Sequence, residues 1–223
     1  YEVATFYAHF NIVKNSDTFE PIKVVRVCES LTCELFGAQK LLSDLKSLEN
    51  KNIKVVAGPC MGRCDVAPTV CVGKNYVDNA SVSKVEKVIQ ENRFEVIVPN
   101  YISLDEYKKD GGYNLVNQIR NGEISDNHII ETLKDSGLKG KGGAGFPTGM
   151  KWEIVSKYNG KKYVAVNGDE GEPGTFKDRT YLERDPHRFL EGALIASLFL
   201  KASNIYIYMR DEYPSVIKIL SDE

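Results

Sequence analysis

Four cysteines occur in the sequence as two closely spaced pairs. Cys28 and Cys33 are separated by four residues, and Cys60 and Cys64 by three. Each pair lies on a loop directly after a run that is typical of a strand, and two parallel neighbouring strands would bring both loops to one end of a sheet. Thiolates bind zinc and iron–sulfur clusters, so this spacing predicts a metal centre rather than a disulfide framework.

Zinc and an iron–sulfur cluster are alternatives at this centre. Both spacings are short enough for zinc ligands. The run GPCMGRC favours a cluster, because its small residues let backbone N–H groups reach the sulfides. A redox disulfide of the C-x-x-C type is excluded by the spacing. The fifth cysteine, Cys71, lies between two valines in a predicted strand, and we expect it to be a core residue.

A glycine-rich stretch with two lysines, GKGGAGFPTGMK, occupies residues 140–151. Glycines adopt positive φ angles or let a ligand approach the main chain, and the helix predicted to follow would direct its first N–H groups toward a phosphate. The stretch is neither a P-loop nor the common dinucleotide fingerprint. It predicts a nucleotide-binding loop, with a flexible hinge as the alternative. Phe146 would either anchor this loop in the core or stack on a flat ring.

Acidic side chains crowd the segment NGDEGEPGTFKDR, residues 167–179, directly after a predicted strand. Asp169, Glu170 and Glu172 could accept hydrogen bonds from ribose hydroxyls or from a flavin edge, and the alternative is a solvated acidic loop. Ligands of α/β proteins bind at the carboxyl ends of parallel strands. The end of a later predicted strand would add three more charged side chains to this edge, namely Arg210, Asp211 and Glu212.

Two sets of elements must position these motifs, and both are α/β. The first set alternates as β-α-β-β-β-α, a small layered fold of thioredoxin type. Its predicted strands are 21–28, 53–58, 67–73 and 76–79, and its predicted helices are 33–48 and 81–92. Residues 93–112 are interpreted as a connection. The second set has predicted helices at 113–121, at 125–136, from about 148 and at 187–201, and predicted strands at 162–167 and 204–210.

Composition limits the classes of partner. Hydrophobic residues make up 42% and charged residues 27% of the 223 residues, as in soluble globular proteins. The net charge of −2 provides no basic field for nucleic acid, and the longest apolar run, 189–200, is shorter than the roughly 20 residues that span a bilayer. We therefore expect no nucleic-acid partner, no direct membrane insertion and a cytoplasmic location, with the cytoplasmic face of a membrane complex as a variant.

The cysteine motifs resemble a known family. CESLTC, followed after 26 residues by CMGRC with DVAPTV behind it, is similar to the thioredoxin-like [2Fe–2S] ferredoxin subunit of the respiratory complex I family, over roughly residues 1–92. The opening YEVATFY resembles the end of that subunit's helical N-terminal region. The resemblance implies that Cys28 and Cys33 hold one iron and that Cys60 and Cys64 hold the other.

The glycine-rich and acidic motifs resemble a second family. GKGGAGFPTGMKW and DEGEPGTFKDR are similar to the FMN- and NADH-binding flavoprotein subunit of complex I and to related diaphorase units, from about residue 103 to residue 223. The resemblance implies that Phe146 stacks on NADH, that Glu172 contacts NADH, and that no side chain need act as an acid or base. The sequence departs from the family pattern at Lys139, Lys141, Ile154 and Asp211. The implied cofactor contacts are Gly140, Lys141, Gly142, Gly143, Ala144, Phe146, Lys151, Asn167, Asp169, Glu170, Glu172, Tyr208 and Glu212.

Together the resemblances imply a fused electron-transfer chain. Its expected parts are the end of a helical region (1–20), a thioredoxin-like [2Fe–2S] domain (21–98) and the first part of an FMN- and NADH-binding α/β domain (99–223). The sequence begins without methionine and is expected to be a fragment, with a [4Fe–4S] domain beyond its end. Such a chain would pass hydride between NAD(H) and FMN, and single electrons through clusters, within a multi-subunit redox complex.

The expected complex is an NAD-dependent formate dehydrogenase. The joined order of the two parts and the stretches YLERDPHRFLEG and YMRDEYP favour it by analogy. An NADH dehydrogenase module of complex I or of an NAD-reducing hydrogenase is the alternative. A zinc-stabilised, non-catalytic interaction module is the alternative from another class.

Overall fold

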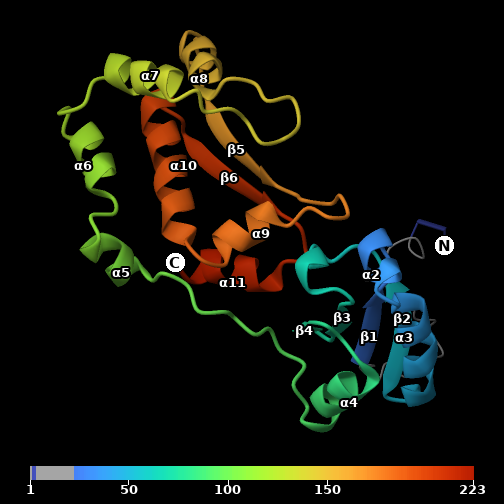
Figure 1. Cartoon of the computed structure of the whole chain (residues 1–223). Helices are drawn as coiled ribbons and strands as arrows, with labels where there is room; N and C mark the ends of the chain where they lie inside the picture. The colour runs from blue at the N-terminus through green and yellow to red at the C-terminus, as the bar shows by residue number, and fades with distance from the viewer. Residues whose placement is uncertain (1, 4–22) are drawn as a thin grey trace. The chain divides into compact units, whose positions relative to one another are not determined.

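Two β-branched runs form neighbouring parallel strands in the computed structural model, which describes residues 2–3 and 23–223 (Figure 1). Strand β1 (Lys23–Cys28) pairs with β2 (Ile53–Gly58), and Cys28 lies opposite Gly58. The predicted parallel pair is therefore confirmed, and the loops after both strands begin at the same end of the sheet. The helical region expected at 1–20 lies, except for residues 2 and 3, outside the described residues.

Two short antiparallel strands complete this sheet. Strand β3 (Val70–Val72) pairs with β1, and β4 (Asn75–Val77) pairs with β3, which gives the order β2-β1-β3-β4. β3 is shorter than predicted and begins after Pro68, whose nitrogen has no hydrogen to donate to a ladder. The sheet and its helices confirm the α/β fold class.

Helices α3 and α4 cover this sheet. Helix α3 (Ala38–Leu45) contacts β1 and β2, and α4 (Val82–Gln90) contacts β3. The single helix predicted at 33–48 is divided at Gly37, whose φ of +86° ends α2 (Leu31–Leu35) before α3 starts. A short 3-10 helix, Lys46–Leu48, follows α3. Cys71 is buried and belongs to the hydrophobic core of this sheet, as predicted.

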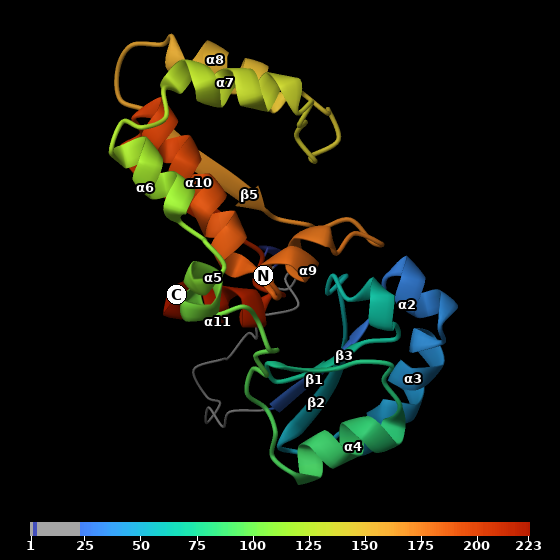
Figure 2. The same ribbon diagram turned by 60° about the vertical axis from the view of Figure 1, so that its left-hand side comes forward.

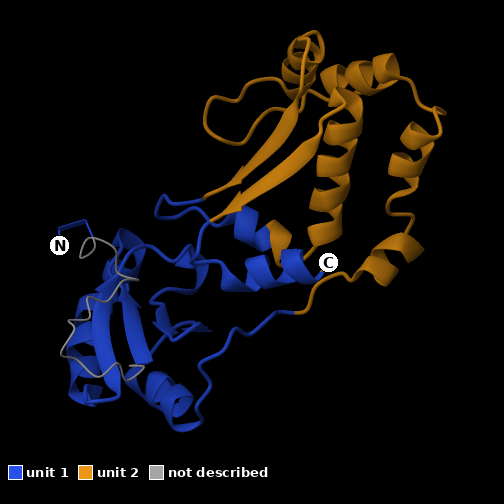
Figure 3. Cartoon of the chain, turned by 180° about the vertical axis from the view of Figure 1, so that it is seen from behind, with its two compact units in different colours: residues 1–99, 170–180, 210–222 blue, residues 100–169, 181–209, 223 orange. Residues whose placement is uncertain are grey.

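Backbone contacts divide the chain into two units (Figure 3). The first comprises residues 1–99, 170–180 and 210–222, and the second comprises residues 100–169, 181–209 and 223. The first unit thus includes two segments that follow the sheet region by more than 70 residues, among them helix α11 (Pro214–Asp222). The domain limits expected at 20/21 and 98/99 stay predictions.

The second unit is built around a parallel two-stranded sheet. Strands β5 (Tyr163–Gly168) and β6 (Asn204–Met209) pair along their whole length. Exposed and less exposed residues alternate along both strands, because helix α10 (Pro186–Leu200) covers one face of the sheet (Figure 1). Three further helices of the second unit are α6 (Asn114–Arg120), α7 (Asp126–Asp135) and α8 (Thr148–Ser156). Figure 2 shows α7 and α8 side by side.

Two helices were not predicted from the sequence. Helix α5 (Leu104–Lys109) lies in the segment interpreted as a connection. Ser103 and Glu106 form a capping box at its start, and the pattern S-x-x-E was a readable signal for it. Helix α9 (Lys177–Leu182) begins within the acidic segment 167–179, for which no helix was predicted. Among the helices that the structure describes, none is both long and apolar enough to cross a bilayer.

Gly149 lets helices α7 and α8 approach closely. A Cβ atom at this position would lie 2.9 Å from Cγ and 3.0 Å from the backbone nitrogen of Lys134. Lys134 also forms a 2.7 Å ion pair with Glu153, which joins the same two helices. A backbone nitrogen cannot move aside as a flexible side chain can, so a methyl group would force the helices apart.

We predict that Gly149→Ala destabilises the protein by about 1–3 kcal/mol, as overpacking of tight interiors does. Thermal unfolding followed by circular dichroism measures this. Gly192→Ala is the matched control, because Gly192 also lies in a helix but has no neighbouring atom within 4 Å of its Cβ position. There we expect a stability that is unchanged or higher by up to about 1 kcal/mol. Equal effects of both substitutions would show that the contact with α7 is unimportant.

Candidate functional site

The four predicted ligand cysteines meet at the carboxyl end of the β1–β2 pair. Cys28 is the last residue of β1, Cys33 lies in α2, and Cys60 and Cys64 lie just after β2. The Sγ atoms of Cys60 and Cys64 are 3.8 Å apart. A tetrahedral metal with bonds of about 2.3 Å to sulfur would separate two of its ligands by about 3.8 Å. The second pair is therefore spaced to share one metal ion.

Hydrogen bonds between the thiols link the two pairs. The pKa of the Cys28 thiol is raised, chiefly by its hydrogen bond with Cys33, and the same bond is the main cause of the lowered pKa of Cys33. Cys28 also hydrogen-bonds with Cys60. Among residues 2–3 and 23–223, no three cysteine, histidine or acidic side chains are grouped so that they could hold one metal ion. Two linked pairs fit a two-iron cluster better than a single zinc ion.

Backbone N–H groups lie close to the cysteine sulfurs, and one of them donates a hydrogen bond. The backbone groups of Ser30, Thr69 and Gly62 act to lower the pKa of Cys28, Cys33 and Cys60 respectively. The donor to Cys64 Sγ is the N–H of Gly174, at 3.2 Å. Hydrogen bonds to the sulfurs are one of the means by which proteins stabilise and tune iron–sulfur clusters. The cysteine loops thus fit a [2Fe–2S] cluster, and the assignment of individual ligands stays a prediction.

The glycine-rich loop leaves a row of backbone donors unused. Its base is closed by a hydrogen bond from Gly140 N to Phe146 O at 2.9 Å and by one from Thr148 N to Leu138 O at 2.8 Å. In the described part of the chain, the N–H groups of residues 141–145 donate no hydrogen bond. Gly143 and Gly145 have φ angles of +92° and +62°. A run of free N–H groups with such angles can receive an anion.

Phe146 is not a core residue. Its side chain is 47% exposed at the end of this loop, which contradicts the interpretation of Phe146 as a core anchor. The exposed ring is available for stacking. Lys141 and Lys151, the two predicted cationic contacts, are exposed as well, on the loop and in α8. Nothing lies within 4 Å of the Cβ positions of Gly142 and Gly143.

The ends of β5 and β6 bring three predicted flavin contacts of the second unit together. Asn167 lies opposite Tyr208 in the register of the two strands. The Asn167 side-chain oxygen accepts the N–H of Asp169 at 3.0 Å, which turns the chain after β5. All three residues are exposed. A side chain at Gly168 would crowd strand β6, because a Cβ atom there would lie 3.0 Å from the backbone oxygen of Tyr208.

The three remaining predicted contacts belong to the first unit. Glu172 is exposed, and the carboxylate of Glu212 pairs with Arg210 at 3.1 Å. Glu170 is only 3% exposed. Its carboxylate accepts hydrogen bonds from the backbone N–H groups of Asp178 and Arg179 and from another buried side chain. Burial would raise the pKa of Glu170, but these bonds outweigh it and lower the pKa. The carboxylate therefore stabilises its own loop.

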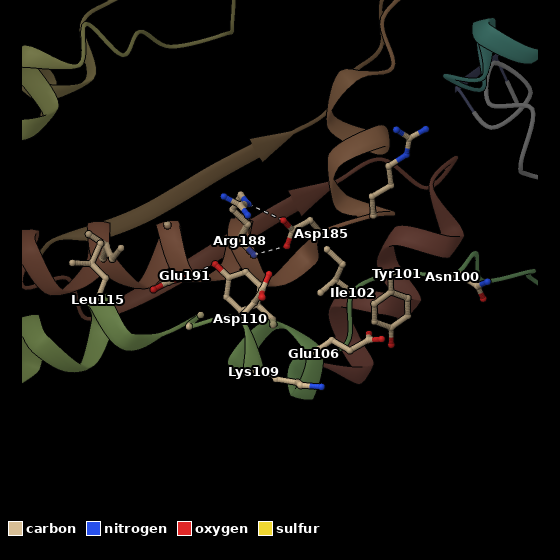
Figure 4. Close-up of a pocket in the computed structure, with 16 residues that line it drawn as sticks. Asn100, Tyr101, Ile102, Glu106, Lys109, Asp110, Leu115, Asp185, Arg188 and Glu191 are labelled. Carbon is tan, nitrogen blue, oxygen red and sulfur yellow. Dashed lines mark hydrogen bonds and ion pairs between the residues drawn. The ribbon is translucent and has the colours of Figure 1, made fainter.

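A cavity in the second unit contains none of the predicted site residues. It has a volume of about 1010 Å³ and lies beside helices α5 and α10 (Figure 4). Asp185 and Arg188 form a 2.7 Å ion pair at its wall, and Tyr107 hydrogen-bonds with Glu191. Asp185, Arg188 and Glu191 on this wall are thus bound to neighbouring side chains.

Comparison with known proteins supports a two-part chain. Residues 1–93 match the family model of the thioredoxin-like [2Fe–2S] ferredoxin, and residues 133–223 match that of the Nuo51 FMN-binding domain. These matches confirm both family resemblances and, with them, the [2Fe–2S] cluster and FMN as the cofactors of the two domain families.

Curated relatives match the second part of the chain. The F subunit of NADH-quinone oxidoreductase of Aquifex aeolicus (strain VF5) is 48% identical over 124 residues, which cover 56% of this chain and 29% of the relative. The protein of the same name in Escherichia coli (strain K12) is 46% identical over 112 residues, which cover 49% of this chain and 25% of the relative. The matched part thus spans less than a third of these relatives.

A solved structure matches the fold of the whole chain. A chain of an NAD+-reducing [NiFe]-hydrogenase in the air-oxidized state has a TM-score of 0.76 and 22% sequence identity. The match covers 99% of this chain and 42% of that chain. Both parts therefore occur in the same order within one solved chain.

We predict that Cys71→Ser keeps the EPR signal of the reduced cluster, whereas Cys60→Ser loses it. Cys71 lies in β3, and its Sγ contacts Gly73 O at 3.3 Å, a hydrogen bond that a hydroxyl can replace. Burial raises the pKa of the Cys71 thiol to about 11, as expected of an unreactive core thiol. EPR of anaerobically reduced full-length protein distinguishes the variants. Loss of the signal in Cys71→Ser at unchanged thermal stability would overturn the ligand set.

Proposed function

We propose that the chain is an electron-transfer module of an NADH:acceptor oxidoreductase. The premise is that it joins a thioredoxin-like [2Fe–2S] ferredoxin domain to part of an Nuo51 FMN-binding domain. Hydride would pass between NAD(H) and FMN, and electrons would move singly through iron–sulfur clusters. The observation that carries the proposal is the presence, in one chain, of four converging thiols and of an open loop of unused N–H groups.

FMN supplies the chemistry that links NAD(H) to the iron–sulfur clusters, because it accepts two electrons as hydride and releases them one at a time. The chain's own residues would bind and orient. The unused N–H groups of residues 141–145 would donate to an anionic or carbonyl oxygen of the cofactor. Lys141 and Lys151 would add positive charge beside it, and Gly140 and Ala144 would complete the loop.

Two further side chains would bind the dinucleotide. The exposed ring of Phe146 would stack on a flat ring of NADH. The exposed carboxylate of Glu172 would accept two ribose hydroxyl groups, since a carboxylate forms charge-assisted hydrogen bonds with both of its oxygens. Asn167, Asp169 and Tyr208 at the ends of β5 and β6 would line the flavin site. No side chain is assigned as an acid or a base.

The parent complex is proposed to be an NAD-dependent formate dehydrogenase, working in the cytoplasm with other redox subunits. The ferredoxin-then-flavoprotein order in one chain and the stretches YLERDPHRFLEG and YMRDEYP support this assignment by analogy. The fold match to a chain of an NAD+-reducing hydrogenase favours hydrogen as the second candidate donor. A formate-dependent or hydrogen-dependent reduction of NAD+ by the purified complex distinguishes them.

The proposal is tested by the cofactors and activity of the full-length protein, purified without oxygen. We expect bound FMN, iron and acid-labile sulfide, broad visible absorbance beyond that of flavin, and reduction of a dye acceptor by NADH. A colourless protein that contains one zinc ion and no flavin would contradict the proposal and would favour an interaction module. Metal analysis and the visible spectrum decide between the two.

We predict that Phe146→Ala weakens NADH binding several-fold and leaves FMN bound. Loss of a stacked ring costs about 1 kcal/mol beyond its buried area, which corresponds to roughly a fivefold loss of affinity. The Michaelis constant for NADH with a dye acceptor measures this. Tyr158→Ala is the control, because Tyr158 is an exposed aromatic residue at the end of α8 and should leave the constant unchanged. An unchanged constant in Phe146→Ala would exclude the stacking role.

A further inference from the structure

The second cysteine loop is held by two buried arginines from distant parts of the sequence. Arg179 is 5% exposed and Arg210 is 8% exposed. Both lie in the first unit, in the segments 170–180 and 210–222. These segments belong to the residues that match the FMN-binding family, whereas the cysteines belong to the residues that match the ferredoxin family.

Arg210 bridges the cysteine loop to the acidic loop. One of its terminal nitrogens donates to the carbonyl oxygen of Cys60, and the other donates to the carbonyl oxygen of Glu170. Its Nε donates to the carboxylate of Glu212 at 3.1 Å. The planar guanidinium therefore uses three of its donors at fixed angles, a task that a lysine ammonium cannot perform in the same way.

Arg179 holds the same loop two residues further on. Its Nε donates to the carbonyl oxygen of Gly62 at 2.9 Å, and its Nη2 pairs with Asp65 Oδ1 at 2.6 Å. The loop between Cys60 and Cys64 thus has two of its carbonyl groups bound to guanidinium groups. Because the C=O and N–H groups of a trans peptide point in opposite directions, fixing these carbonyls also fixes the direction of the N–H groups that follow them.

Tyr213 completes the support of this loop. Its side chain is 1% exposed, and its hydroxyl donates to Glu170 Oε2 at 3.1 Å. A Cβ atom on Gly62 would lie 2.2 Å from the Tyr213 hydroxyl oxygen, so the ring packs directly against the glycine. Gly174, in the same segment as Arg179, supplies the N–H donor to Cys64 Sγ.

We propose that Arg179 and Arg210 are positioning residues of the metal centre, which hold the second cysteine loop in its ligating shape and raise the reduction potential of its cluster. The proposal rests on the function proposed above, since it requires a [2Fe–2S] cluster at the four cysteines. Reduction adds an electron to the cluster and so adds negative charge. Buried positive charge beside it favours the reduced form, because the protein interior screens charges less than water does.

Arg210 and Glu212 form one ion pair, and the loss of either charge should shift the reduction potential of the cluster in opposite directions. Removing Arg210 removes positive charge near Cys60 and should lower the potential. Removing the charge of Glu212 leaves the guanidinium uncompensated and should raise the potential. A loss of packing without an electrostatic role would not produce opposite signs from neighbouring residues, so the sign separates the two explanations.

The experiment is an EPR-monitored redox titration of full-length Arg210→Met, Arg210→Lys and Glu212→Gln proteins. We expect Arg210→Met to shift the reduction equilibrium about tenfold toward the oxidised form, which is about 59 mV for a one-electron couple. Arg210→Lys should shift it less, because the charge remains. Glu212→Gln should shift it in the other direction, and Arg179→Met should act like Arg210→Met.

Arg93→Gln is the matched control. It removes one positive charge from the same unit, but the Arg93 side chain is 48% exposed and paired with Glu91 at the surface, where solvent screens it. The reduction potential of the cluster in Arg93→Gln should equal that of the unaltered protein. If Arg210→Met fails to assemble a cluster, Arg210→Lys and Glu212→Gln carry the test.

The outcomes that overturn the proposal are distinct from failure of the proposed function. Unchanged potentials, or shifts of Glu212→Gln and Arg210→Lys in the same direction, would contradict the role of the arginines while the cluster is intact. Absence of a [2Fe–2S] signal in the unaltered protein would refute the proposed function itself, and the inference with it.

Discussion

The parallel pairing of β1 with β2 is the constraint on which the metal centre depends. Strand β1 ends at Cys28, and β2 ends shortly before Cys60. The loops after the two strands lie at the same edge of the sheet only if the strands run in the same direction. An antiparallel pair would place Cys28 and Cys60 at opposite ends of the sheet. The crossover through α2 and α3 makes the parallel arrangement possible, because parallel neighbours require a connection long enough to return along the sheet.

Local patterns made most of the fold predictable from the sequence. β1 and β2 are short β-branched runs bounded by polar or glycine residues, and α10 is a long apolar helix that begins after Asp185 with a proline in its first turn. The predicted cysteine pairs converge as their spacing required. The division of the helix at 33–48 was less visible, because Gly37 is compatible with a helix until its positive φ is known. The S-x-x-E signal of α5 was present and was not used.

Contacts between distant segments could not be predicted in the same way. Nothing local in Arg179 or Arg210 indicates that their guanidinium groups bind carbonyls near Cys60, which is 119 and 150 positions earlier in the sequence. Glu170 resembled a solvent-exposed acidic residue because it follows Asp169 and precedes Gly171. Its burial depends on the backbone N–H groups of α9 and on Tyr213. The exposure of Phe146 likewise depends on how its loop closes at residues 140 and 146.

The N–H group of Gly174 bears on why the two domain families occur in a single chain. A ferredoxin segment expressed by itself would lack the N–H donor to Cys64 Sγ and would leave the carbonyls of Cys60 and Gly62 to water. If the missing segment were a separate molecule, it would have to bind by diffusion and to lose its translational freedom on each encounter. Covalent linkage replaces that encounter with an effective local concentration that for flexible tethers is on the order of millimolar. A few hydrogen bonds then suffice to keep the segment in place, where a free subunit would need an extensive interface.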